Sequence, residues 1–135
     1  MSVEGPSAAT GVNFTKAERL CGRIRLKEVV STGKAVHESP IKLVGKKLGP
    51  QDGVQAQVAF AVPRRNMKRA VQRNRVRRLM REAWRLNKPH LHERLQGRNA
   101  LYAWLFIYQG REPIGFQETR LKITRSLDRW LNEHG

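Results

Sequence analysis

The stretch QAQVAFAVPRRNMKRAVQRNRVRRLMREAWRL, residues 55–86, changes its hydrophobic period partway along its length. From Gln55 to Val62 larger apolar residues alternate with small or polar ones, which predicts a strand with two different faces. From Arg69 to Leu86 the apolar residues recur at helical spacing, and Pro63 ends the strand before the helix begins. The stretch therefore predicts a strand, a basic loop and a long helix in succession.

Further elements are predicted on both sides of this stretch. They are a helix over Arg23–Ser31, strands over Lys34–Glu38, Ile41–Lys47 and Ala100–Tyr108, and a final helix over Phe116–Leu131. The segment 48–54 is rich in Gly and Pro, so we expect the strands on either side of it to pair as a hairpin. Pro89 is expected to close the long helix, with a separate helical turn over Leu91–Leu95.

The predicted element order is α-β-β-β-α-β-α. A strand, a helix and another strand in succession imply a parallel crossover, so we expect a single α+β domain around a mixed four-stranded sheet. The general rule for such crossovers predicts a right-handed connection. We expect residues 1–13 to form a flexible tail and residues 14–132 to form the domain. The tryptophans Trp84, Trp104 and Trp130 fall at positions typical of a core.

The charge of this domain limits the classes of ligand that it is expected to bind. The net charge is +16, with 18 Arg against 9 Lys, and residues 64–85 hold 10 of the 27 basic residues with Glu82 as the only acid. Such a chain is attracted to phosphate, and Arg grips phosphate and stacks on bases better than Lys does, which favours nucleic acid over an anionic membrane. Like charges four residues apart, as at Arg73, Arg77 and Arg81, destabilise an isolated helix, so a phosphate-binding face is favoured over a merely solvated one. Charge alone does not distinguish DNA from RNA.

No independent active site or metal site is predicted. The acidic residues are scattered and include only two Asp, whereas metal-dependent nucleases need clustered carboxylates. His90 and His92 have neither a helix-face nor a ligand spacing, and Cys21 is the only cysteine. A lone cysteine and the lack of a long apolar run predict a cytoplasmic protein without a membrane partner.

Asn74 lies between two arginines on the polar side of the predicted helix. Its amide can bond a base edge, a sugar hydroxyl or neighbouring backbone, or serve only as a local cap. The segment around it, AVQRNRVRRLMREA over Ala70–Ala83, resembles the pattern A-V-x-R-N-R-[IV]-[KR]-R-x-x-R-[EQ]-A of the bacterial ribonuclease P protein component family. Arg19-Leu20, the helix that ends before Gly33 and the strand before the motif extend this resemblance over residues 14–132.

The resemblance implies a protein subunit of ribonuclease P, with a left-handed crossover at the basic helix. It implies that a catalytic RNA, with Mg²⁺ bound mainly by that RNA, cuts precursor tRNA to remove its 5′ leader, so the chain belongs to an endoribonuclease without carrying its chemistry. The implied partners are the catalytic RNA and precursor tRNA, with one protein bound to one RNA. The alternative is a ribosomal or structural RNA-binding protein without a role in cleavage.

The resemblance also assigns residues to two RNA contacts. The surface for the catalytic RNA would comprise Arg64, Arg65, Lys68, Arg69, Arg73, Asn74, Arg75, Arg77, Arg78 and Arg81. A cleft between the first helix and the sheet would hold the 5′ leader with Leu26, Val30, Lys42, Val44 and Lys46. Many relatives carry aromatic residues at the positions of Leu26, Val30 and Val44, so the cleft is expected to grip each base less strongly than stacking would.

Overall fold

The computed structural model describes residues 23–49 and 55–135. The elements are α2 (Arg23–Thr32), β1 (Lys34–Glu38), β2 (Ile41–Leu48), β3 (Ala56–Ala61), α3 (Ala70–Leu95), β4 (Leu101–Tyr108) and α4 (Phe116–His134). This order confirms the predicted α-β-β-β-α-β-α arrangement and the α+β class. The predicted tail over residues 1–13 and the motif residues Arg19 and Leu20 lie outside the described residues.

The sheet is mixed and four-stranded, with the order β1-β2-β4-β3. β4 runs antiparallel to β2, from Ile41↔Tyr108 to Leu48↔Leu101, and parallel to β3. The predicted hairpin between β2 and β3 is therefore wrong, because β4 lies between them. β4 is apolar throughout and buried along almost its whole length, and such a strand is stable only in the interior of a sheet.

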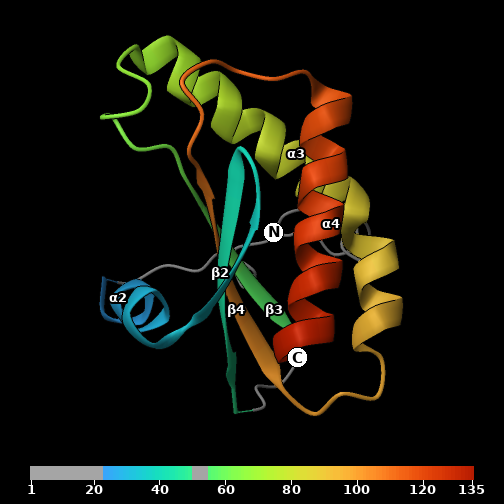
Figure 1. Ribbon diagram of the computed structural model, residues 1–135. Helices are drawn as coiled ribbons and strands as arrows, with labels where there is room; N and C mark the ends of the chain where they lie inside the picture. Colours follow the sequence, from blue (N-terminus) through green and yellow to red (C-terminus); the bar gives the residue numbers. More distant parts are fainter. Residues whose placement is uncertain (1–22, 50–54) are drawn as a thin grey trace, which may run out of the picture.

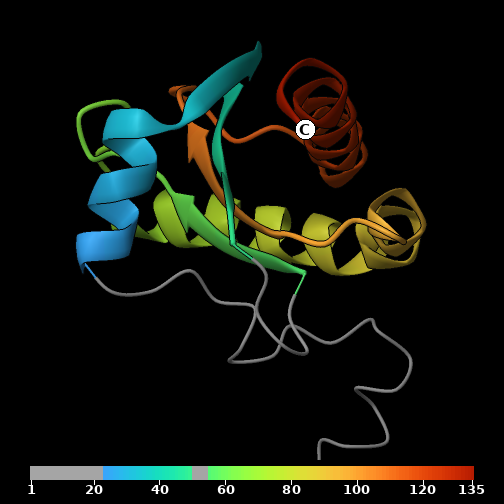
Figure 2. The ribbon, with the colours of Figure 1, turned by 90° about the horizontal axis from the view of Figure 1, so that it is seen from below.

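The β3-α3-β4 crossover is left-handed. With the two strands pointing up and the sheet seen from the side covered by α3, β4 lies to the left of β3 (Figures 1 and 2). The general rule predicted the opposite hand, so that expectation is wrong and the hand implied by the family resemblance is confirmed.

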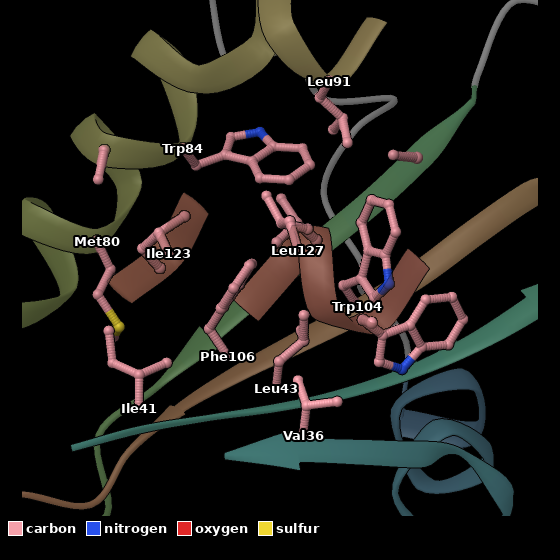
Figure 3. Close-up of a cluster of buried hydrophobic side chains, with 14 of the residues drawn as sticks. Val36, Ile41, Leu43, Met80, Trp84, Leu91, Trp104, Phe106, Ile123 and Leu127 are labelled. Atoms are coloured by element: carbon pink, nitrogen blue, oxygen red, sulfur yellow. The ribbon is translucent and has the colours of Figure 1, made fainter. Parts of the chain in front are cut away.

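The helices cover the sheet on both faces (Figure 2). α3 and α4 pack on one face over the main core, in which Trp84, Trp104 and Trp130 are all at most 1% exposed. The rings of Trp84 and Trp104 meet edge to face with centroids 6.1 Å apart (Figure 3). Those of Trp104 and Trp130 also meet edge to face, with centroids 5.7 Å apart. α2 packs on the other face over a smaller cluster that includes Val29, Val44 and Leu105.

The basic helix does not end at Pro89. α3 continues to Leu95, with Pro89 inside it, and Gly97 follows with a φ of 83°. Proline removes one helical hydrogen bond, but the turns on either side of Pro89 bury Trp84, Leu91 and Leu95 in the core. Packing of these side chains outweighs the local cost, so the predicted break is wrong and Leu91–Leu95 is part of one long helix.

Candidate nucleic-acid interface

The first half of α3 is held to the domain by one face and leaves the others to solvent. Val76, Met80 and Ala83 are at most 2% exposed and pack into the main core. The preceding loop is anchored in the same way by Met67, which is 1% exposed. This apolar anchoring follows from the helical spacing in the sequence, and it presents the cations of the loop and the helix on one surface.

Six cations on this surface are exposed and unengaged. Within the described part of the chain their side chains form no hydrogen bond or ion pair; they are Arg64, Arg65, Lys68, Arg69, Arg75 and Arg78. Guanidinium groups in this state are available to bind phosphate, bidentately where the geometry allows. We refer to these six residues as the free cations.

The other polar residues of the motif make contacts within the protein. Arg73 donates from Nη1 to the carbonyl oxygens of Met67, at 3.0 Å, and Lys68, at 2.7 Å. Arg77 donates to Oδ1 of Asn74 at 2.6 Å, which leaves the amide nitrogen of the exposed Asn74 facing solvent as a donor. Arg81 is also exposed.

Glu82, the one acid in this region, is engaged by Arg85. Arg85 donates to both carboxylate oxygens, and the Nε–Oε2 distance is 3.1 Å. This hydrogen bonding lowers the pKa of Glu82 and raises that of Arg85. The pair neutralises itself, so Glu82 does not cancel the charge of the free cations.

Arg111 extends the surface from a segment that sequence reasoning did not select. β3 and β4 are parallel, so the loops that follow them leave the sheet at the same edge (Figure 1). Arg111, in the loop after β4, is exposed and unpaired among the described residues. In the sequence Arg111 belongs to no basic cluster and is followed by an acid, Glu112. The parallel pairing of β3 and β4 is what brings it to the end of the sheet that also carries the β3–α3 loop.

The predicted cleft residues lie where α2 crosses the sheet. Lys42, Val44 and Lys46 alternate along β2 on the face toward α2, and Val44 is buried there with Leu26 packed against its cluster. Lys46 donates to Glu28, at 2.8 Å, and to Thr32, so it fastens α2 to the sheet. Val30 is 56% exposed.

The sheet beside α2 carries partly buried apolar side chains that were not among the predicted cleft residues. Ala59 and Ala61 of β3 and Ile107 of β4 are only partly buried against the α2 cluster. The alternation of Gln55–Val62 predicted both alanines on one face, and this was the sequence feature that could have indicated them. The two alanines add little side-chain bulk beside α2.

Metal-ligand clusters and membrane-spanning helices are both absent from the described residues. Residues 23–49 and 55–135 hold no group of three or more His, Cys, Asp or Glu that could bind a metal ion. In the same ranges, no helix has both the length and the apolar character needed to cross a membrane.

Fold and surface together define a small α+β domain with an exposed basic helix on a left-handed crossover, a combination suited to binding nucleic acid. Comparison with known proteins gives the family. The sequence model of the Ribonuclease P family matches residues 14–131. The chain belongs to this family, acts in tRNA 5′ processing as the protein component of ribonuclease P, and associates with the RNase P RNA.

Curated relatives and solved structures agree with this assignment. Two proteins named Ribonuclease P protein component, from two strains of Porphyromonas gingivalis, are 33% identical over 116 residues and 35% identical over 117 residues. Each alignment covers 86% of this chain and 85% of the relative. The fold is similar to Staphylococcus aureus RNase P protein, with TM-scores of 0.61 and 0.55 in two structures at 14% and 20% identity. These matches cover 84% and 89% of this chain and 95% and 91% of the solved chains.

Proposed function

We propose that this chain binds the RNase P RNA through its free cations and holds the 5′ leader of precursor tRNA beside α2, while the RNA carries out the cleavage. The observation that carries the proposal is the set of six exposed cations that have no partner among the described residues. They border a helix whose opposite face is fixed in the core, so RNA can dock without rearranging the domain.

The protein contributes electrostatics and orientation rather than chemistry. The free cations neutralise RNA phosphates and release counterions, which favours assembly. The leader lies beside α2 against Ala59 and Ala61 in this proposal, and that placement directs the scissile phosphodiester toward the RNA's own reactive groups. The exposed side chain of Val30 and the ammonium group of Lys42 supply apolar and charged contacts to that leader.

We also propose that the Mg²⁺ ions of the reaction are held mainly by the RNA, which supplies the oxygen ligands that this ion prefers. The scattered acids of the sequence support this division. One protein binds one RNA in this proposal, with the basic edge of the domain as the docking surface. The assembly acts in the cytoplasm, where precursor tRNA is made.

Cleavage of precursor tRNA at low Mg²⁺ tests the proposal. The chain alone should cleave nothing, and adding it to a bacterial RNase P RNA should restore multiple turnover. A protein that binds the RNA without stimulating cleavage would contradict the proposal and favour a purely structural RNA-binding role.

The RNA-binding surface has its own test in the double variant Arg75→Gln/Arg78→Gln. The slope of log affinity against log salt concentration should fall by about 0.7–0.9 for each phosphate that is no longer neutralised. Arg120→Gln/Arg125→Gln is the matched control, because it removes the same two charges from exposed arginines on α4 whose side chains have no partner among the described residues. Equal effects of the control and the double variant would show that only net charge matters.

A further inference from the structure

We infer that Arg73 is a positioning residue: it orients the β3–α3 loop so that the cations of that loop meet the RNA, and it is not itself a phosphate ligand. The inference rests on the proposed RNA-binding function and divides the motif into two kinds of residue. Arg73 braces the surface, while Arg75 and Arg78 contact the RNA.

The first observation is the pair of hydrogen bonds that Arg73 makes. Its Nη1 lies 3.0 Å from the carbonyl oxygen of Met67 and 2.7 Å from that of Lys68. Hydrogen bonds from a charged donor are stronger than neutral ones. Both N–H groups of Nη1 are thus taken by backbone carbonyls, so a phosphate can reach this side chain only at its Nε–Nη2 edge or by displacing these bonds.

The second observation is that the start of α3 lacks the usual capping interactions. The N-cap residue, Arg69, makes no side-chain capping bond, and the first turn contains no acidic residue. The backbone before it turns at Pro63, whose carbonyl accepts from the amides of Asn66 and Met67 at 3.2 and 3.3 Å. The guanidinium group of Arg73 and the buried side chain of Met67 are therefore what tie this turn to the helix.

The third observation concerns what the brace holds. Four of the free cations, Arg64, Arg65, Lys68 and Arg69, lie in this loop. Loss of the two hydrogen bonds from Arg73 to backbone carbonyls frees the loop that carries these four cations. Arg75 and Arg78 lie in the helix itself and stay in place. The charge of Arg73 matters less than its shape, because lysine has one compact donor group in place of the planar fork.

The test is the charge-conserving substitution Arg73→Lys, with Arg125→Lys, at an exposed position on α4 outside the RNA surface, as the matched control. Arg73→Lys should weaken binding to RNase P RNA about tenfold, the scale of one charge-assisted hydrogen bond, and should reduce the salt slope although no charge is removed. Amide hydrogen exchange at Asn66 and Met67 should accelerate in the free protein. Arg125→Lys should change neither the exchange nor the slope.

The outcomes separate the possible roles. If Arg73→Lys behaves like the wild type and Arg73→Gln lowers the slope by the amount expected for one phosphate, Arg73 is a phosphate ligand and the inference is wrong. If exchange accelerates while affinity and slope stay unchanged, the brace is structural only, which also overturns it. If Arg75→Gln/Arg78→Gln leaves RNA binding intact, the proposed RNA surface itself fails, whatever the exchange at Asn66 and Met67 shows.

Discussion

The ammonium group of Lys46 in β2 lies 2.8 Å from a carboxylate oxygen of Glu28 in α2 and 2.9 Å from the hydroxyl of Thr32. A residue predicted to contact the leader is thus engaged in joining the helix to the sheet. Lys46 sets the position of α2 before any RNA is bound. In the proposed arrangement the leader contact then falls to Val30, Lys42, Ala59 and Ala61.

Replacing Lys46 with Met tests this arrangement. Because exposed ion pairs contribute only about 0–1 kcal/mol, the domain should stay folded. Affinity for precursor tRNA should fall, and affinity for tRNA without a leader should not, when both are measured on the assembled ribonucleoprotein. Lys47→Met is the control, since Lys47 is exposed and unpaired among the described residues. If affinity falls equally for tRNA with and without a leader, Lys46 has no part in leader binding.

A larger side chain beside α2 should also weaken leader binding. Ala59→Leu places a larger side chain beside α2, where it competes with the leader for space. We expect affinity for precursor tRNA to become independent of leader length, while affinity for the RNase P RNA stays the same. Ala35→Leu, at an exposed position on the edge strand β1, is the control. If the Ala59 variant still distinguishes long from short leaders, the leader lies elsewhere.

Gly45 is expected to tolerate no side chain. A Cβ atom there would lie 2.3 Å from Cδ1 of Trp104 and 2.6 Å from Cε2 of Trp130, and both rings are fully buried. Gly45→Ala should therefore lower the free energy of unfolding by about 1–3 kcal/mol through over-packing, measured by urea denaturation. At Gly49 a Cβ would meet nothing within 4 Å, so Gly49→Ala should be close to neutral.

Tyr108 should ionise late. Burial raises its pKa above the usual 10.0, and its hydroxyl donates to the carbonyl of Glu112 at 2.6 Å. The unfolded chain loses this proton first, so the contribution to stability is complete below pH 10 and falls as pH rises above it. The chain has two tyrosines, so Tyr102→Phe isolates the signal of Tyr108 in a phenolate absorbance titration. A midpoint at or below 10 would contradict the burial argument.

The elements of the fold could be predicted from the sequence because their hydrophobic periods are local. The strand order could not, since the apolar strand Leu101–Tyr108 fits any interior position and the turn-rich segment 48–54 favours a hairpin. The break expected at Pro89 failed for a similar reason: Leu91 and Leu95 bury their side chains against distant residues. Propensity does not include such contacts.

The candidate site was predictable as a region rather than residue by residue. Charge and motif located the basic helix, and the structure shows its apolar face buried. Charge and motif could not show that Arg73 donates hydrogen bonds to two backbone carbonyls or that Lys46 pairs with Glu28, because tertiary geometry sets those partners. Nor could they place Arg111, which reaches the same edge only through the order of the strands.

The insertion of β4 between β2 and β3 has a consequence for synthesis. When the ribosome has made residues 1–100, the basic helix α3 has been synthesised, but β4, an interior strand of the sheet, is still missing. β2 and β3 have no partner that joins them until Leu101–Tyr108 emerges, and such late, non-local pairing is slow. The basic helix is therefore synthesised before the strand that completes the core beneath it, and its final orientation is set only when β4 pairs with β2 and β3.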